Sequence, residues 1–257
     1  NDPAAVAQLE AMFKRFPGEE TVRTALVNWH VGQENFPAAE QILRALAGDP
    51  ATDAPGHLTI VQFLRRAYGE DAARTALQDL IAQTTGEDVM PLYQAMAIMI
   101  DFEADMTSDA LPRMQALTAN LAPSDQNRRI TAMYAQMLVA SDDRDTATDV
   151  VAAILAEDRS NVTALKMRAT WAIADDQPDA AIADLRAALS QNPRDAETMM
   201  LLATAHERTG FPELAGERLA LAVEVSDAAA VPSLRYARFL IRDDRTQAAA
   251  SVLKDAR

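Results

Sequence analysis

The sequence predicts an all-α fold, a right-handed α-solenoid of about seven antiparallel helix pairs. The main observation is an internal repeat of 34 residues that runs through residues 128–257. A second is that Val, Ile and Thr never alternate over a strand-length run, so we expect no sheet. A third is the composition, since 49% hydrophobic residues and only 8 glycines suit helices that bury apolar stripes against their neighbours.

Four columns of residues recur at the 34-residue spacing. Two of them contain only alanine: Ala135, Ala169, Ala203 and Ala237, and then Ala147, Ala181, Ala215 and Ala249. Two apolar columns keep the same register: Val151, Leu185, Leu219 and Leu253, and then Ile154, Ala188, Ala222 and Ala256. A fixed period of this size indicates a stack of similar units, each too small to bury its own apolar face.

The clearest unit spans residues 165–193. Its apolar residues form two stripes with helical i, i+4, i+7 spacing: Leu165, Ala169 and Ala172, followed by Ala181, Leu185 and Ala188. Residues 175–178, Asp-Asp-Gln-Pro, form the predicted turn, and Pro178 is placed to start the second helix. Residues 192–195, Asn-Pro-Arg-Asp, end that helix.

This unit resembles the tetratricopeptide repeat family in its period, its small-residue positions and its terminal Pro193. The resemblance implies pairs of helices that approach closely at the small residues. The sequence departs from the family at the bulky first anchor of each repeat, and the family's turn glycine is kept only as Gly210. The anchor positions hold Thr131, Leu165, Met199 and Ser233.

Upstream of residue 128 the period blurs, but paired helices continue. We expect a unit around Leu26, Trp29 and residues 36–46, with Asn35 as the helix cap. Further helices are predicted at residues 3–16, 56–68, 70–84, 89–105 and 109–121. Ser108 or Asp109 would cap the last of these, and Pro123 follows its end. The chain is thus expected to be one continuous solenoid, with a degenerate repeat segment at 1–127 and regular repeats at 128–257.

Charge and residue usage exclude several function classes. The net charge of −14 argues against a nucleic-acid partner, whose phosphates would be repelled. The absence of cysteine excludes disulfides and thiolate chemistry, and apolar runs stay well short of a membrane span. No glycine-rich phosphate loop or Gly-x-Ser-x-Gly elbow occurs, so we expect no enzyme activity, no cofactor and no membrane insertion.

Three sets of residues have both a functional and a structural interpretation. His30, His57 and His206 lack the spacing of a zinc-binding helix, so ordinary packing is favoured and no metal site is predicted. The acidic pairs at 142–143, 175–176 and 243–244 suit turns and helix caps better than a calcium loop. The methionines could form an adaptable groove, although core packing is favoured: Met90, Met96, Met99, Met106 and Met114.

The resemblance also implies a binding surface. In tetratricopeptide proteins the first helix of each pair lines a concave groove that holds an extended or helical peptide. Projecting that geometry onto this sequence selects Arg129, Gln136, Lys166, Thr170, Met200, Thr204, Arg208, Arg235 and Arg238. The set is rich in arginine, which matches planar carboxylates.

The family's chaperone-binding members use a clamp of five polar residues. Lys166 and Arg235 match two of its positions, but Thr170, Met200 and Val231 do not match the other three. We therefore do not expect binding of a chaperone C-terminus.

The sequence thus favours a noncatalytic protein-interaction scaffold that binds a protein or peptide. Because the chain begins within a helix of a pair, we expect a fragment of a larger bacterial protein, with the cell envelope slightly favoured over the cytoplasm. One alternative is an architectural segment that self-associates through exposed ends and holds nothing in its groove. Another is an accessory domain of an enzyme whose catalytic part lies elsewhere.

Overall fold

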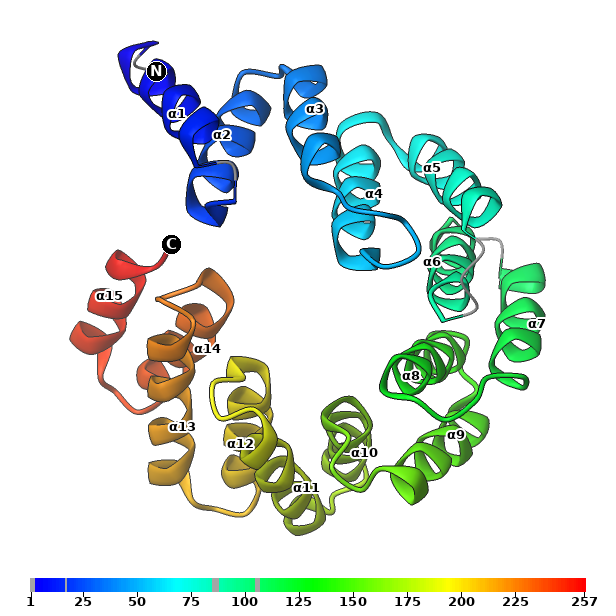
Figure 1. The fold of residues 1–257 in the computed structure, drawn as a ribbon. Helices are drawn as coiled ribbons and strands as arrows, with labels where there is room; N and C mark the ends of the chain where they lie inside the picture. The colour runs from blue at the N-terminus through cyan, green and yellow to red at the C-terminus, as the bar shows by residue number, and fades with distance from the viewer. Residues whose placement is uncertain (1–2, 17, 85–87, 105–106) are drawn as a thin grey trace. The chain divides into compact units, whose positions relative to one another are not determined.

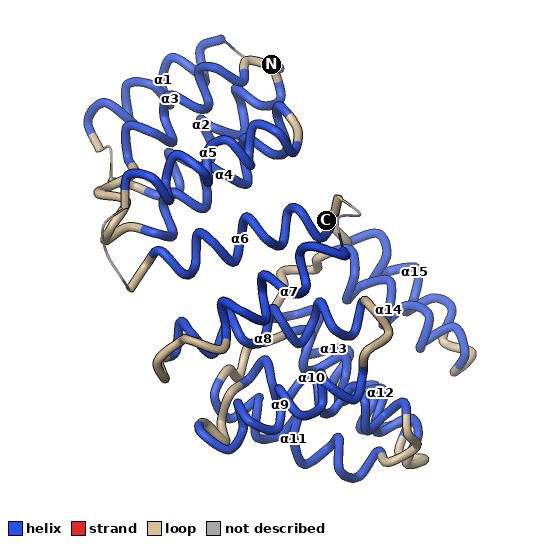
Figure 2. The backbone as a smooth tube through the Cα atoms, turned by 90° about the vertical axis from the view of Figure 1, so that its right-hand side faces the viewer, coloured by secondary structure: helices blue, strands red, loops and turns tan. Residues whose placement is uncertain are grey.

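A computed structural model describes residues 3–16, 18–84, 88–104 and 107–257, and within these ranges every regular element is an α-helix (Figures 1 and 2). The fifteen helices are α1 Pro3–Arg15, α2 Glu20–Gly32, α3 Phe36–Leu46, α4 Ala54–Tyr68, α5 Glu70–Gln83, α6 Met90–Glu103, α7 Thr107–Thr118, α8 Asp125–Ala140, α9 Arg144–Glu157, α10 Val162–Ala174, α11 Pro178–Gln191, α12 Ala196–Arg208, α13 Pro212–Val225, α14 Ala230–Arg242 and α15 Thr246–Asp255. They follow one another as antiparallel pairs, from α2 and α3 to α14 and α15, with α1 left over. The all-α fold of paired helices is confirmed.

Two predicted helix starts were wrong. The helix expected at 56–68 is α4, which begins at Ala54. The helix expected at 109–121 is α7, which begins at Thr107, so Ser108 and Asp109 lie inside its first turn and not at its cap. The Asp109 carboxylate instead forms an ion pair with Arg113, one turn further along, at 3.0 Å. An acidic side chain stabilises the first turn of a helix as well as its cap, so the residue type alone did not fix the start.

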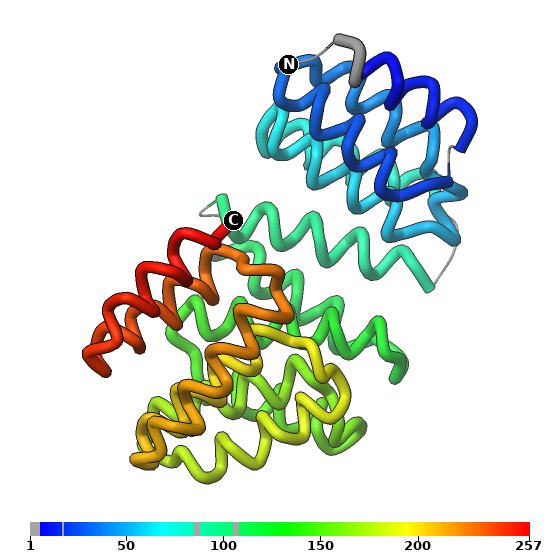
Figure 3. The backbone as a smooth tube through the Cα atoms, turned by 90° about the vertical axis from the view of Figure 1, so that its left-hand side faces the viewer, coloured from blue at the N-terminus to red at the C-terminus, as the bar shows by residue number. Residues whose placement is uncertain are grey.

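The chain divides into two compact units, residues 1–133 and 134–257, and the division falls within α8. In the second unit, each helix from α9 to α15 packs against the next one in chain order, along the green-to-red course of the backbone (Figure 3). The predicted change from degenerate to regular repeats at residue 127 describes periodicity, and it stays a prediction.

A single turn geometry joins the two helices of each pair in the second unit. Asp142, Asp176, Gly210 and Asp244 are spaced 34 residues apart, and all have positive φ, between 56° and 78°. In each turn the next residue donates its backbone N–H to a carbonyl five residues back, at 2.7–2.9 Å. This is the Schellman ending of a helix, which requires one left-handed residue. The turn role predicted for these aspartates is confirmed.

Side chains at the helix starts confirm further turn chemistry. The Asn35 side chain accepts a hydrogen bond from the Ala38 backbone N–H at the start of α3, as predicted. Asp143 does the same for Thr146 at the start of α9, and Asn161 for Ala164 at the start of α10. Each cap satisfies a backbone donor that the helix itself leaves unpaired.

The alanine columns lie at the helix contacts of the second unit. All eight alanines are at most 2% exposed. Alanine permits this close approach because it has no atoms beyond Cβ. In the leucine column, Val151, Leu185 and Leu219 are buried, but Leu253 is 42% exposed, since α15 has a helix packed against only one of its sides.

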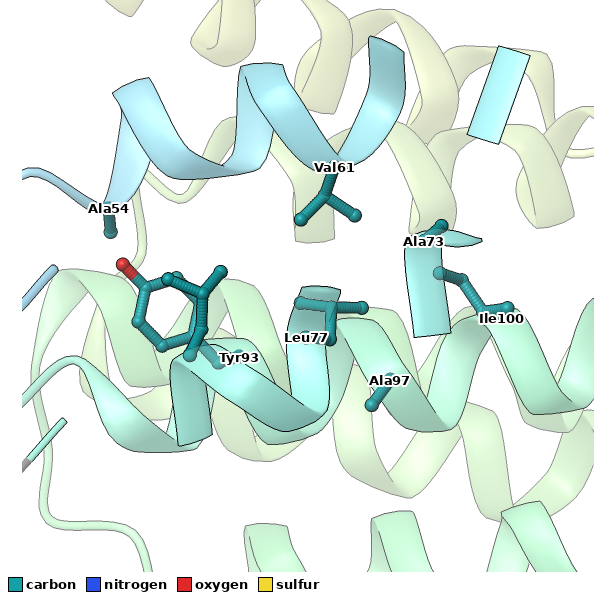
Figure 4. Packing of buried hydrophobic residues seen from close by; sticks show 8 residues of the cluster. Ala54, Val61, Ala73, Leu77, Tyr93, Ala97 and Ile100 are labelled. Atoms are coloured by element: carbon teal, nitrogen blue, oxygen red, sulfur yellow. The ribbon is translucent and has the colours of Figure 1, made fainter. Parts of the chain in front are cut away.

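The first unit has a core of larger side chains. Val61 of α4, Leu77 of α5 and Ala97 of α6 face one another, and the Tyr93 ring fills the space towards Ala54 (Figure 4). The Tyr93 hydroxyl donates to the Pro50 carbonyl at 2.8 Å, so its polar end is satisfied.

Two methionines of the predicted cluster confirm the core interpretation. Met114 is fully buried, and Met96 packs against the same core as Tyr93. Met90 and Met99 are partly buried, and Met106 lies outside the described residues.

Candidate functional site

The second unit has a groove between α12 and α14, the first helices of two consecutive pairs. It encloses about 340 Å³. Its walls are Glu197, Met200, Leu201 and Thr204 from α12, and Val231, Leu234, Arg235 and Arg238 from α14.

These eight residues occupy four positions of the repeat, each of which occurs once on α12 and once on α14. Each lining residue of α12 has its counterpart on α14 exactly one period later, so that, for example, Met200 corresponds to Leu234 and Thr204 to Arg238. Within each helix the four positions follow the i, i+3, i+4, i+7 spacing of one face. The groove therefore follows directly from stacking one repeat on the next.

The apolar wall of the groove is exposed to solvent. Val231 is 66% exposed and Leu234 is 48% exposed, and both line the same groove. Met200 and Leu201 continue this surface on α12 and are partly buried. Contiguous exposed apolar side chains with polar residues at their edge are typical of a binding surface.

The groove contains two arginines, and they differ in whether a carboxylate of this chain forms an ion pair with them. Arg235 is held by the chain itself, since its guanidinium forms an ion pair with Glu207 and contacts the Thr204 hydroxyl at 3.4 Å. Arg238 is exposed, and among the described residues no carboxylate forms an ion pair with it. Arg238 is thus the cation of this groove that remains available to a partner.

The structure brings four of the nine sequence-predicted residues together. Met200, Thr204, Arg235 and Arg238 all line this groove. Lys166 and Thr170 lie on α10, one repeat earlier, where the Thr170 hydroxyl donates to the Lys166 carbonyl at 2.8 Å. Gln136 is an exposed residue of α8 in the second unit, and Arg129, also exposed and on α8, belongs to the first unit.

Lys166 and Arg208 contact carboxylates of this chain. The Lys166 ammonium lies 3.2 Å from Asp195 and also contacts Glu197. Burial lowers the pKa of Lys166, but the two carboxylates outweigh this and raise it above its usual value. Arg208 lies 3.6 Å from Asp176, an exposed and weak pair. A partner carboxylate would have to compete with these contacts.

Sequence reasoning missed the main apolar residues of the groove, Val231 and Leu234. The signal was present, because Leu234 lies one period after the selected Met200. The nine residues predicted from the sequence are mostly polar or cationic, and an aliphatic residue at the same repeat position was not included.

The first unit has another groove, formed by α2, α3 and α4, with Phe36 and Leu43 from α3. It is smaller, about 210 Å³. Its walls include Phe36 and Phe63, and both rings make edge contacts with Tyr68, at centroid distances of 6.0 and 6.4 Å. Arg66 is the charged residue among its lining.

The histidines take packing positions. His30 and His206 are buried, and the His57 ring contacts the Gly48 carbonyl at 2.9 Å. Burial lowers the pKa of His206, and Arg186 and Arg218 add to this effect. In the described part of the chain no three His, Cys, Asp or Glu residues gather as a metal site would require, and no helix is long and apolar enough to cross a membrane.

Comparisons with known proteins give similarity at the level of structure. No protein-family model matches the sequence, and no curated protein matches it. A tetratricopeptide repeat protein from Parabacteroides merdae matches with a TM-score of 0.55 and 11% identity, over 78% of this chain and 79% of its own. The C-terminal part of a repeat protein of the same kind from Cytophaga hutchinsonii matches with a TM-score of 0.53 and 12% identity, over 76% and 77%.

A MamA double mutant matches with a TM-score of 0.49 and 16% identity, over 63% of this chain and 92% of its own. The first two matches cover most of this chain. Together with the 34-residue repeat, they confirm that the chain has the fold of tetratricopeptide repeat proteins.

Proposed function

We propose that this chain is a noncatalytic protein-interaction scaffold that binds a peptide or protein segment in the groove between α12 and α14. The observation that carries the proposal is the exposed apolar wall of Val231 and Leu234 beside the unpaired Arg238. When a partner covers these two exposed aliphatic side chains, apolar surface is removed from water, and this stabilises the complex.

The groove also indicates what the partner segment contains. Apolar side chains at alternate or helical spacing would pack on Met200 and Leu234, and a carboxylate would pair with Arg238. Arg235, Lys166 and Arg208 are secondary, because carboxylates of this chain already neutralise them. The proposed binding surface is therefore smaller than the set of nine predicted residues. It consists of a hydrophobic anchor with one cation beside it.

A peptide library displayed on phage tests this proposal with a defined probe. Random 16-residue peptides are selected on the wild-type protein, and enriched peptides are then measured on two variants by fluorescence anisotropy. Leu234→Asp places a charge in the groove. Ile241→Asp is the matched control, because Ile241 lies on the same helix and is similarly exposed, at 51%, but does not line the groove.

We expect enriched peptides to carry apolar anchors and a carboxylate, and to lose at least about tenfold in affinity on Leu234→Asp but not on Ile241→Asp. Equal binding to all three proteins would overturn the proposal. Thermal unfolding of both variants checks that they fold as the wild type does.

Self-association is the second candidate, and one contrast favours it. Leu253 is 42% exposed, whereas its counterpart Leu219, one repeat earlier, is fully buried. The same surface that packs helices together inside the unit is therefore open on α15. Sedimentation velocity over a range of concentrations tests this: a dimer that Leu253→Lys converts to monomer supports self-association, and a monomer at all concentrations excludes it.

A further inference from the structure

The second unit has another pocket, on a different face of α14 from the groove. It encloses about 390 Å³ between α13, α14 and the turn that joins α14 to α15. Its lining is Pro212, Glu213, Gly216, Glu217, Ala220, Tyr236, Phe239, Asp243 and Arg245. None of these residues lines the groove between α12 and α14.

The pocket arises where one repeat departs from the others. The position of Gly216 holds Thr148, Ile182 and Ala250 in the other three repeats. A Cβ atom at residue 216 would lie 3.0 Å from the Phe239 ring, so a side chain here would press on the ring and fill the pocket. A glycine in a helix interior makes the helix less stable than an alanine would. Gly216 therefore costs α13 stability, and this cost is offset only if the space beside it is used.

The inner wall of the pocket is aromatic. The Tyr236 and Phe239 rings are stacked, with centroids 6.5 Å apart and planes 20° from parallel. One repeat earlier, the same positions hold Leu202 and Ala205. The ring pair is thus particular to this repeat.

The rim of the pocket is acidic. Glu213 and Glu217 lie one helical turn apart on α13, and among the described residues neither forms an ion pair. Like charges at this spacing repel each other. Asp243 completes the rim, with Arg245 at 3.9 Å as the one cation. Glu217 replaces Ala183 of the preceding repeat, whereas the repeat before that holds Asp149 at the same position.

We propose that this pocket binds an arginine side chain of a partner protein. A guanidinium group is planar and weakly hydrated, so it stacks on an aromatic ring and donates hydrogen bonds to carboxylates at the ring's edge. The acidic rim excludes phosphate and carboxylate ligands. Among the described residues no three His, Cys, Asp or Glu side chains gather here as a metal ion would require.

The experiment titrates two small probes, the N-acetyl N′-methylamides of arginine and of citrulline, into the wild-type protein. Citrulline is the neutral isostere of arginine, so it tests charge at constant shape. Binding is followed by NMR through the aromatic resonances of Tyr236 and Phe239. We expect saturable shifts with the arginine probe and a response at least about fivefold weaker with the citrulline probe.

Two variants test the pocket itself. Glu213→Gln combined with Glu217→Gln should weaken arginine binding by about fivefold or more, whereas the single change Glu224→Gln, on the same helix outside the pocket, should leave it unchanged. Gly216→Ile restores the residue type of the preceding repeat and should abolish binding. If this variant does not fold, the glutamine variants decide.

The proposal is overturned if both probes shift the rings equally, or if the double glutamine variant binds arginine as well as the wild type does. Leu234→Asp serves as a reference, because it changes the groove and leaves this pocket intact. Failure of the groove proposal and failure of this one are therefore distinguished in the same set of proteins.

Discussion

The grooves of the two units differ in the helices and in the side chains that line them. In the second unit the groove lies between α12 and α14, the first helices of consecutive pairs, whereas in the first unit α3 lines the groove together with α2 and α4. In the first unit Phe36 and Phe63 occupy the wall and contact Tyr68. In the second unit, aliphatic residues and Arg238 leave a groove of 340 Å³ against 210 Å³.

The difference shows what a strict repeat contributes to a binding surface. Where the 34-residue period holds, equivalent positions on successive helices line up, and the residue type at each position can change without disturbing the packing. The buried alanines keep the helix contacts the same from repeat to repeat, and the residues at the exposed positions vary. In the first unit the 34-residue period blurs in the sequence, and the aromatic contacts join α3 of one pair to α4 of the next, since Phe36 contacts Tyr68.

The largest expected effect tests whether both units depend equally on close helix contacts. Ala169→Leu in the second unit and Ala73→Leu in the first should each lower the free energy of unfolding by about 1–3 kcal/mol, since both alanines are fully buried. Ala174→Leu and Ala82→Leu, at exposed positions, are the controls and should change little. Urea unfolding followed by circular dichroism measures all four. If buried and exposed sites respond alike, the helix register is wrong.

The two units differ in the backbone conformation of their turn glycines, Gly69 and Gly210. Gly69 of the first unit has φ 94° and ψ −177°, a region that is almost exclusive to glycine, so Gly69→Ala should cost about 1–3 kcal/mol. Gly210 of the second unit has φ 78°, where its counterparts are aspartates, so Gly210→Ala should cost about 1 kcal/mol.

No atom lies within 4 Å of a Cβ placed at either glycine, so both effects are conformational and not steric. Gly210→Asp, which copies the other repeats, should cost less than Gly210→Ala because aspartate tolerates this conformation better. Thermal unfolding compares the variants. A Gly210→Ala cost above that of Gly69→Ala would contradict the distinction between the two turns.

Acid should destabilise each unit through an aspartate that is at least partly buried, Asp101 in the first unit and Asp195 in the second. Burial raises the pKa of Asp101, but hydrogen bonds from Arg113 and Arg74 outweigh this and lower it. Burial likewise raises the pKa of Asp195 in the second unit, and Thr198 and Lys166 outweigh it. Because each folded-state pKa lies below the unfolded value, this stabilisation is present above about pH 4 and is lost as pH falls through the folded-state pKa.

Asp101→Asn and Asp195→Asn should each reduce stability by about 1–2 kcal/mol at pH 7 and flatten the loss between about pH 5 and pH 3. Asp149→Asn, at an exposed position of α9, is the control. Urea unfolding at a series of pH values gives the slopes. An unchanged slope in either aspartate variant would show that the ion pair does not form in solution.

Local patterns in the sequence were enough to predict most of the fold. The stripe of Leu165, Ala169 and Ala172 and the proline at 178 fix α10 and the start of α11 to within a residue or two. The acidic pairs correctly indicated turns, because aspartate both tolerates the left-handed conformation and caps helices. The start of α7 was misplaced since several residues there suit a first turn equally well.

The groove could be predicted only in part. Its helices and four of its residues follow from the period, but the ionic state of the cations does not. Lys166 pairs with Glu197, and Arg235 with Glu207, about 30 residues away along the chain, and such pairing depends on which rotamers two neighbouring helices permit. The pocket beside Gly216 needed a comparison of each repeat with its neighbours, which spacing alone does not provide.

Hydrogen exchange with a bound peptide tests the central claim most directly. A peptide selected on the wild-type protein is added at saturation, and the exchange of backbone amides is compared with that of the free protein. We expect increased protection in α12 and α14 of the second unit and none in α2 and α4 of the first. Protection confined to α2 and α4, or to α13 and α15, would contradict the assignment of the groove between α12 and α14.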